Sequence, residues 1–340
     1  MSWKNQHIVI VGPAHPLRGG LATYNERLAL ELQKQNKVTI LTFTLQYPNI
    51  LFPGESQYTD SPKPEHLDID IALNSVNPFN WIKVGLKYKK LRPDVIIFRF
   101  WMPFFGPAFG LFGRIVKSNN HTRLIAITDN IIPHETRFFD RPFTSYFLGM
   151  LDGAVSMSKE VLQDLKSHFP KTKVSQNAHY NPHPLYDNFG EKLGRNEACE
   201  TIGLNPNRKY ILFFGFIRKY KGLDWLIKAF LQAADQLENV DLLIAGEFYE
   251  DAAPYHAITE NSPLKDRIHW HTHFIPNERV SAYFSVADLV AQSYKSATQS
   301  GVSQVAYHFD VPMLITNVGG LSELVPHDVA GWVSEPNIGS

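Results

Sequence analysis

The sequence predicts an α/β protein of two domains, each built around a doubly wound parallel sheet. Short apolar runs alternate with segments whose apolar residues recur at helical spacing, and this alternation starts again in the second half. Between the two series, Asn177–Pro184 is rich in turn-forming residues and shows neither period. The chain has 340 residues, more than a single domain usually contains. We therefore predict one domain over residues 1–184 and a second over residues 185–340, with ligands in the cleft between them.

The elements of the first domain follow from apolar runs separated by turns. A continuous apolar run near the start predicts a buried strand, and Leu21, Tyr24, Leu28 and Leu32 then recur at helical spacing. The expected strands are His7–Val11, Val38–Phe43, Val95–Phe100, Leu124–Ile127 and Gly153–Ser156, and the expected helices are Leu21–Leu32 and Lys159–His168. Strands that alternate with helices in this way indicate a parallel sheet.

The pattern restarts after a polar connection that runs to about Asn207. The expected strands are Tyr210–Phe214, Val240–Ala245, Ile268–His271, Leu289–Ala291 and Met313–Thr316, and the expected helices are Gly222–Ala234, Asn277–Ser285, Gly301–His308 and Leu321–Val325. The second domain is therefore expected to repeat the architecture of the first.

Composition and charge exclude several classes of protein. Lys plus Arg and Asp plus Glu both number 33, which argues against a nucleic-acid-binding protein with a broad basic surface. The chain begins without a signal-peptide pattern and its lone Cys199 cannot form an internal disulfide, so we expect a cytoplasmic protein. The uncharged segment Phe100–Gly113 is too short to span a bilayer. It is expected to be buried, or else to form an aromatic surface that touches a membrane peripherally or an apolar acceptor.

A basic loop follows the first strand of the second domain. It carries Arg218, Lys219 and Lys221 just ahead of a helix. Cations at a helix start are unfavourable with the helix dipole unless an anion neutralises them. A second segment, Ser296–Val302 (SATQSGV), offers hydroxyls, an amide and backbone N–H groups ahead of another helix. Two such turns in one domain indicate a bound diphosphate, most economically that of a nucleotide, whereas a solvated basic helix entrance is the alternative for the first loop.

A glycine-rich turn follows the first strand of the first domain. The segment Gly12–Gly20 (GPAHPLRGG) ends in a glycine pair, Gly19 and Gly20, ahead of the first helix. Paired glycines allow close approach of a ligand, and a helix start attracts negative charge. A tight turn without a ligand is the alternative.

Polar residues also follow the fourth strand of the first domain. In the segment Asp129–Glu135 (DNIIPHE), the side chains of Asn130, His134 and Glu135 would orient sugar hydroxyls or a leaving group, whereas a capped turn is the alternative. Three histidines that alternate along a later strand, at 269, 271 and 273, have no carboxylate or thiolate at ligand spacing, and we expect no metal site there.

Taken together, these segments resemble the family 4 glycosyltransferases, whose GT-B fold has two Rossmann-like domains that face each other across a cleft. The resemblance covers nearly the whole chain, through GPAHPLRGG, FRFWMPF, DNIIPHE, FGFIRKYKG, AGEFYED, SYKSATQSGV and VPMLITNVGGLSELV. It implies transfer of a sugar, with retention at the anomeric carbon, from a nucleotide-diphosphate donor to a glycan or lipid-linked acceptor. It also implies that no metal or other cofactor is needed, and that the C-terminal half holds the donor and the N-terminal half the acceptor.

The resemblance assigns roles to particular residues. Arg218 and Lys221 match the family's cationic pair on the donor diphosphate, and Gly19-Gly20 match the glycine pair that approaches it from the opposite domain. Ser300, Gly301 and Val302 would add backbone donors, with Thr298 and Gln299 near the donor sugar. The expected catalytic residues are Asn130, His134 and Glu135.

The chain also departs from the family pattern. Many members carry two glutamates around the segment that matches Ser296–Val305, whereas no acidic residue lies between Asp288 and Asp310. A histidine often stands where this chain has Asp129. Members also usually continue past the match to Gly331-Trp332 into further helices, so the chain is expected to be a truncated form. Two alternatives follow: a non-catalytic protein of the same fold that binds a sugar nucleotide or glycan, and a sugar-nucleotide epimerase.

Overall fold

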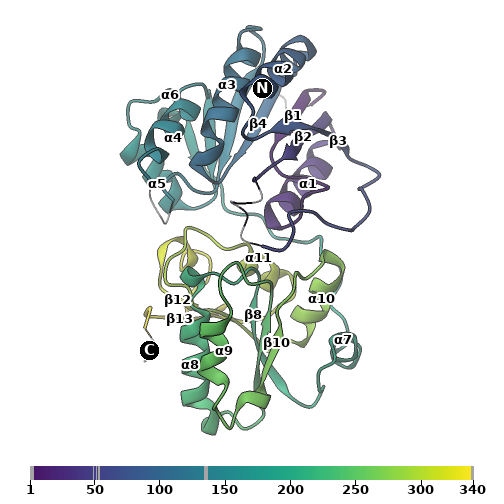
Figure 1. Cartoon of the computed structure of the whole chain (residues 1–340), viewed down its shortest axis with the longest axis vertical. Coiled ribbons are helices and arrows are strands. Elements are labelled where there is room, and N and C mark those ends of the chain that lie inside the picture. The colour runs from purple at the N-terminus through teal and green to yellow at the C-terminus, as the bar shows by residue number, and fades with distance from the viewer. Residues whose placement is uncertain (1–3, 49, 51, 53, 134–136, 338–340) are drawn as a thin grey trace. The chain divides into compact units, whose positions relative to one another are not determined.

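The computed structural model describes residues 4–337 except 49, 51, 53 and 134–136. The chain folds into two compact units, Met1–Pro182 and His183–Ser340, which are described separately (Figure 1). The predicted domain boundary, after residue 184, lies close to this division. In the part of the chain that is described, no helix is both long enough and apolar enough to cross a bilayer.

The N-terminal unit contains a seven-stranded sheet in the order β3-β2-β1-β4-β5-β6-β7, in which all neighbouring strands are parallel. Its strands are β1 (His7–Val11), β2 (Lys37–Leu45), β3 (Asp68–Asn74), β4 (Val95–Phe100), β5 (Arg123–Thr128), β6 (Gly153–Ser156) and β7 (Ala178–Tyr180). Its α-helices are α1 (Gly20–Leu32), α2 (Pro78–Leu91), α3 (Gly106–Lys117), α4 (Asp140–Leu148), α5 (Lys159–His168) and α6 (Lys173–Gln176).

An aromatic core lies between this sheet and its helices. Helix α3 packs between α2 and α4, and its side chains Phe109 and Phe112 are fully buried against Phe98 of β4. Phe147 of α4 stacks on Phe100 with ring centroids 4.4 Å apart. Aromatic pairs at such distances add to the free energy gained from burial. The segment Phe100–Gly113 is therefore mainly core, as the first of its two interpretations expects, and its contact with a membrane or an apolar acceptor stays a prediction.

The C-terminal unit repeats the architecture with a six-stranded parallel sheet in the order β10-β9-β8-β11-β12-β13. Its strands are β8 (Lys209–Phe214), β9 (Val240–Ala245), β10 (Ile268–His271), β11 (Leu289–Gln292), β12 (Met313–Thr316) and β13 (Gly331–Ser334). Its α-helices are α7 (Arg195–Ile202), α8 (Leu223–Ala233), α9 (Ala253–Thr259), α10 (Asn277–Val286) and α11 (Gly301–His308). The expectation of two parallel-sheet α/β domains is confirmed.

Some elements differ from the sequence prediction. Strand β3 and helix α2 were not expected, and β7 lies within the stretch that was predicted to connect the domains. The expected helix Leu321–Val325 is wrong, because only a 3₁₀ turn, Gly319–Leu321, forms there. Pro326 follows directly, and the residue before a proline is disfavoured in the α conformation.

Each sheet reverses its strand order once. In the N-terminal unit the reversal lies between β1 and β4, and in the C-terminal unit it lies between β8 and β11. In open α/β sheets, ligands bind at the carboxyl ends of the strands where the order reverses. The basic loop after β8 and the segment that links β11 to α11 both leave such a reversal point.

Candidate functional site

The loop after β8 is fixed against the loop after β11 by backbone contacts. The Ser293 hydroxyl donates to the carbonyl oxygens of Lys221 and Gly222, at 3.2 and 3.0 Å. Gly222 has φ of 66°, and a Cβ there would lie 2.0 Å from the Ser293 carbonyl oxygen. The Lys295 amide also donates to the carbonyl oxygen of Tyr220, at 2.6 Å. Only glycine permits this conformation and this close approach. Gly222 therefore allows the loop after β8 to pack directly against the loop after β11.

Lys221 carries a positive charge into a buried position. Its side chain is 9% exposed, and its Nζ lies 5.6 Å from the centroid of the Tyr294 ring. Nζ also lies 3.2 Å from the position that a Cβ on Gly215 would occupy. Burial, together with the nearby charge of Arg218, lowers the pKa of Lys221 to about 7. A desolvated ammonium group is costly unless an anion lies beside it.

Arg218 lies in the same loop and is half-buried. Its guanidinium carbon is 4.9 Å from the centroid of the Tyr249 ring. Among the residues that the structure describes, neither Arg218 nor Lys221 forms an ion pair with a carboxylate. Two neighbouring cations without an internal counter-charge form a site that fits a polyanion such as a diphosphate.

The segment ahead of α11 adds neutral groups to this site. Thr298 and Ser300 are buried, and the Ser300 hydroxyl lies 3.3 Å from the hydroxyl of Tyr294. Ser300 does not cap α11 through its side chain, so the first amides of the helix are not satisfied by that hydroxyl. Val302 Cγ2 lies 3.8 Å from the position of a Cβ on Gly215, beside which Lys221 Nζ also lies.

The C-terminal unit therefore brings together the residues that were predicted for donor binding. Arg218 and Lys221 lie in the loop after β8, and Gln299 and Gly301 lie with Thr298, Ser300 and Val302 between β11 and α11. Their common position is the reversal point of the sheet. Their roles toward a ligand stay predictions.

The predicted glycine pair of the N-terminal unit forms the start of α1. Gly19 has φ of 103°, and its carbonyl oxygen accepts from the amides of Ala22 and Thr23 at 3.0 and 3.2 Å. The turn is held from outside by Arg18, whose Nε donates to the carbonyl oxygen of Ser56 at 2.7 Å. Helix α1 thus begins at Gly20 without a side-chain cap, which suits it to an anion. The part of Gly19 and Gly20 in donor binding stays a prediction.

A buried ion pair lies just before the predicted catalytic turn. Arg99, in β4, donates from Nε and Nη2 to the two carboxylate oxygens of Asp129, at 2.5 and 2.6 Å. The guanidinium also lies 3.8 Å from the ring centroid of Tyr24. Asp129 therefore anchors the turn, and Asn130 follows it, half-buried, at the carboxyl end of β5. Arg99 was not predicted, although a charged residue inside the apolar run VIIFRF is a usable signal.

The other two predicted catalytic residues, His134 and Glu135, lie outside the described residues. The histidines of β10 have separate partners: His269 Nε2 lies 3.0 Å from an Asp241 oxygen, and His271 Nδ1 lies 2.9 Å from the Tyr283 hydroxyl. Across the described part of the chain, no three His, Cys, Asp or Glu side chains are grouped so as to hold a metal ion. The absence of a metal requirement stays a prediction.

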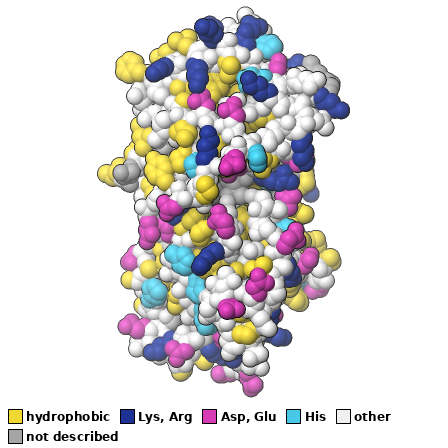
Figure 2. Space-filling model, turned by 90° about the vertical axis from the view of Figure 1, so that its right-hand side faces the viewer, with side chains coloured by type: hydrophobic (Ala, Val, Ile, Leu, Met, Phe, Trp, Pro, Cys, Tyr) yellow, Lys and Arg dark blue, Asp and Glu magenta, His cyan; other side chains and the backbone are white. Residues whose placement is uncertain are grey.

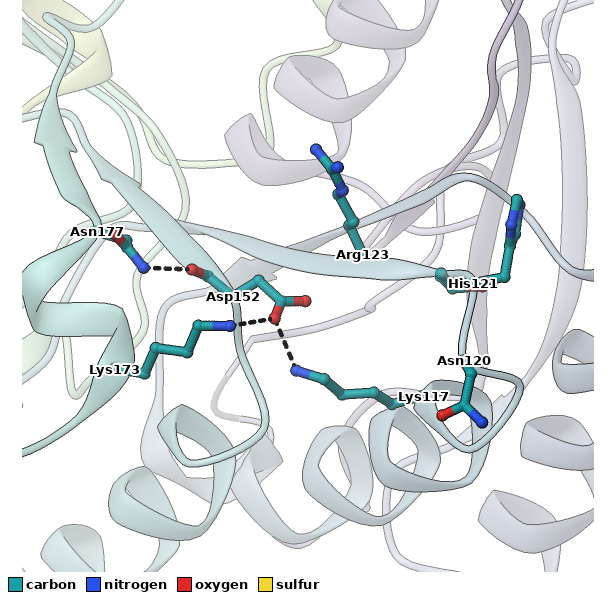
Figure 3. Close-up of a pocket in the computed structure, with 8 residues that line it drawn as sticks. Lys117, Asn120, His121, Arg123, Asp152, Lys173 and Asn177 are labelled. Atoms are coloured by element: carbon teal, nitrogen blue, oxygen red, sulfur yellow. Dashed lines mark hydrogen bonds and ion pairs between the residues drawn. The ribbon is translucent and has the colours of Figure 1, made fainter. Parts of the chain in front are cut away.

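A polar pocket lies at the other edge of the first sheet, at the amino ends of β5 and β6. Figure 3 shows Lys117 and Lys173 both pointing toward Asp152, at 2.9 and 3.0 Å, while Arg123 and His121 point away from them. Asp152 therefore forms an ion pair with each of the two lysines. This pocket is remote from the reversal point of the sheet, and we assign it no ligand.

Comparison with known proteins shows what the chain is similar to. Residues 195–339 match the sequence model of the family described as glycosyl transferases group 1. The chain is 26% identical over 190 residues to the uncharacterized glycosyltransferase MJ1607 of Methanocaldococcus jannaschii, a match that covers 54% of this chain and 46% of that protein. It is 31% identical over 133 residues to the putative glycosyltransferase YtcC of Bacillus subtilis, covering 37% and 32% respectively. The matched parts thus span less than half of these curated relatives.

Solved structures resemble the chain over almost its full length. The sucrose-phosphate synthase of Thermosynechococcus elongatus matches with a TM-score of 0.73 at 15% identity, covering 98% of this chain and 86% of that one. Alr3699/HepE of Anabaena, solved in complex with UDP and glucose, also gives a TM-score of 0.73, at 14% identity and the same coverage. At these identities the likeness concerns the fold, and it confirms the expected GT-B fold class.

Proposed function

Because residues 195–339 carry a glycosyl transferase group 1 domain, we propose that this chain is a retaining glycosyltransferase. It moves a sugar from a nucleotide-diphosphate donor to a glycan or lipid-linked acceptor. The C-terminal unit binds the donor, and the N-terminal unit binds the acceptor. A lipid-linked acceptor would bring the protein into peripheral contact with a membrane. The cytoplasmic location of the protein stays a prediction.

The observation that carries the proposal is the pair of cations after β8, of which Lys221 is buried and Arg218 half-buried. Lys221 is almost fully buried, and neither it nor Arg218 has a carboxylate partner among the described residues. A nucleoside diphosphate supplies the missing negative charge. Alr3699/HepE, of the same fold, has been solved with UDP and with UDP-glucose, which supports a nucleotide sugar as the donor class.

The same groups favour the transferase reaction. When the bond between the sugar and the diphosphate breaks, negative charge builds on the leaving oxygen. Arg218 and Lys221 are fixed in place before that charge appears, because Ser293 holds the carbonyl oxygen of Lys221. Preorganised donors of this kind stabilise the transition state more than the ground state, and losing one costs about 2.7–4 kcal/mol. The two fixed positive charges also stabilise negative charge on the diphosphate, as a metal ion does in other phosphate sites.

We also propose roles for further residues of each unit. Thr298 and Gln299 contact the donor sugar, while Ser300, Gly301 and Val302 offer backbone amides to the diphosphate. In the N-terminal unit, Asn130 lies at the carboxyl end of β5, and we assign it a catalytic role together with His134 and Glu135. The Arg99–Asp129 pair positions Asn130 through the backbone.

The test combines binding and turnover. Purified protein is titrated calorimetrically with UDP, GDP and ADP, and nucleoside diphosphate release from the matching sugars is then measured with and without candidate acceptors. Arg218→Ala and Lys221→Ala are expected to abolish binding while the far-UV circular dichroism spectrum is unchanged. Unchanged affinity in both variants would contradict the proposed site.

A second candidate is supported by the absence of acidic residues between Asp288 and Asp310. A protein of this fold that binds a sugar nucleotide or glycan without turnover needs no acidic group beside the donor sugar. Binding of a sugar nucleotide without release of nucleoside diphosphate would favour this non-catalytic binding protein. A sugar-nucleotide epimerase is distinguished by its product, which keeps the nucleotide attached.

A further inference from the structure

Four aromatic side chains meet on the N-terminal unit beyond the ends of β2 and β4. Tyr47 and Phe52 follow β2, Trp101 and Phe104 follow β4, and together they are called the aromatic cluster. The Tyr47 ring stacks on Phe52 and on Phe104, with centroids 6.2 Å and planes 25° apart in both pairs. All four side chains are half-buried, so each keeps part of its surface open to a ligand.

The inner side of the aromatic cluster rests on the core of the unit. The Phe105 side chain is fully buried, and its ring centroid lies 4.3 Å from that of Trp101 and 5.4 Å from that of Tyr47. Hydrophobic side chains reach the surface at several places on the N-terminal unit, as Figure 2 shows, so exposure alone does not select a binding site. The aromatic cluster is distinguished by how firmly its rings are held and by its place on the sheet.

Tyr47 is held both at its backbone and at its hydroxyl. The buried Gln57 side chain pairs with the Tyr47 backbone, since the Tyr47 amide donates to Gln57 Oε1 at 3.0 Å and Gln57 Nε2 donates to the Tyr47 carbonyl oxygen at 2.8 Å. Trp101 Nε1 donates to the Tyr47 hydroxyl at 2.8 Å. Two rings of the cluster are thus fixed relative to each other before a ligand arrives. Groups that are already ordered lose little conformational entropy on binding.

The aromatic cluster is also tied to the glycine turn ahead of α1. The Arg18 amide donates to the carbonyl oxygen of Gln57 at 3.0 Å, and Arg18 Nε donates to that of Ser56 at 2.7 Å. Gln57 therefore connects this turn to Tyr47. Trp101 leaves β4, one of the two strands between which the sheet order reverses. The aromatic cluster thus lies at the edge of the sheet where open α/β sheets bind their ligands.

We propose that the aromatic cluster binds a pyranose ring of the acceptor by stacking, so that the acceptor is recognised as a glycan whether or not a lipid carries it. The inference rests on the proposed function, because only a glycosyltransferase needs an acceptor. One face of a pyranose presents C–H groups, which pack against the electron-rich faces of aromatic rings, while its hydroxyls stay at the rim.

The geometry favours a sugar over a hydrocarbon chain. Apolar attraction is non-directional, so a hydrocarbon chain gains equally from apolar surface of any shape. Ring planes that are nearly parallel and held by hydrogen bonds add nothing for such a chain, whereas a rigid, flat sugar ring makes use of them. The Tyr47 hydroxyl also places a polar group among the rings.

The experiment is saturation-transfer difference NMR on the full chain, without nucleotide. The probes are the methyl pyranosides of glucose, galactose, mannose and N-acetylglucosamine, with cyclohexylmethanol and farnesyl phosphate as apolar probes. At least one pyranoside is expected to bind and to receive saturation mainly at the C–H protons of one ring face. Phe52→Leu and Phe104→Leu keep an apolar side chain but remove a flat ring, and each is expected to weaken the affinity for that pyranoside about 2- to 10-fold.

The matched control is Phe79→Leu, which changes an exposed phenylalanine of α2 in the same unit and is expected to bind as the wild type does. Circular dichroism and the thermal midpoint verify that every variant is folded. The proposal is overturned if none of the pyranosides receives saturation, or if both leucine variants of the cluster bind undiminished. Saturation of farnesyl phosphate without saturation of any pyranoside would assign the cluster to a lipid instead.

Titration of the same samples with UDP, GDP and ADP separates this inference from the proposed function. The proposed donor site lies in the C-terminal unit, so Phe52→Leu and Phe104→Leu are expected to leave nucleotide affinity unchanged. A wild-type chain that binds a nucleotide but no pyranoside overturns only the role of the aromatic cluster. A chain that binds none of the nucleotides counts against the proposed function itself.

Discussion

Binding of a nucleoside diphosphate is expected to depend on pH through one side chain. Burial and the charge of Arg218 lower the pKa of Lys221 to about 7, so at higher pH the free protein holds this lysine increasingly neutral. A bound diphosphate favours the charged form and raises the pKa again. Binding above pH 7 therefore takes up a proton at Lys221, and the affinity falls as the pH rises.

The size of the effect follows from linkage. Each pH unit above the pKa of the free protein costs about 1.36 kcal/mol, or about tenfold in the dissociation constant. From pH 7 to pH 9, affinity is expected to fall about 50-fold, because Lys221 is already half neutral at pH 7. Titration of the ligand contributes little between pH 7 and pH 9, because a terminal phosphate has its second pKa near 6 and is already ionised in this range.

Calorimetric titration at several pH values, in buffers of different ionisation enthalpy, measures both the affinity and the proton uptake. Lys221→Met should bind weakly and show no slope above pH 7, because its side chain cannot take up a proton. Lys219→Met is the matched control, since Lys219 lies in the same loop but is exposed. A wild-type affinity that stays flat from pH 7 to pH 9, with no proton uptake, would refute the assignment of Lys221 to the ligand.

Three further outcomes are expected, each measured by chemical denaturation. Lys221→Met should raise the free energy of unfolding by about 4 kcal/mol at pH 7 without ligand, because burial holds the pKa of Lys221 at about 7, well below its ordinary value, and this difference opposes folding. This gain should shrink at higher pH, where the folded wild type has lost the proton that the unfolded chain still binds; a gain that grows with pH would contradict the sign. Asp129→Ala should cost about 3–5 kcal/mol by leaving Arg99 buried without its carboxylate, whereas Asp129→Ala combined with Arg99→Met should cost less than the sum of the two single losses, and additive losses would show that the pair is not coupled. Gly222→Ala should cost more than the roughly 1 kcal/mol of a φ penalty, since its Cβ would meet the Ser293 carbonyl oxygen, and a smaller loss would show that the loops are not locked.

Much of the sheet could be predicted because parallel strands are buried on both faces. Such strands are continuous apolar runs, and His7–Val11, Val95–Phe100 and Gly153–Ser156 were predicted with the bounds that the structure shows. Strand β3 and helix α2 were missed for a related reason. Strand β3 is a half-exposed edge strand, and α2 directs apolar residues both inward and outward, so neither shows a single apolar face.

The candidate site could be predicted where its functional residues lie close together in the sequence. The loop with Arg218 and Lys221 was found because three basic residues stand ahead of a helix. The Arg99–Asp129 pair was not found, because its members are 30 residues apart and meet only through the pairing of β4 with β5. Short sequence motifs do not indicate which residues meet when two strands pair.

The hydrogen bonds from Ser293 to the carbonyl oxygens of Lys221 and Gly222 have a thermodynamic consequence. A loop that is already tied down has little conformational freedom left to lose when a ligand arrives. Nucleotide association with the C-terminal unit should therefore carry only a small ordering penalty. Loosening the tie, as Ser293→Ala would do, should show mainly as a less favourable entropy of association and leave the enthalpy of the phosphate contacts intact.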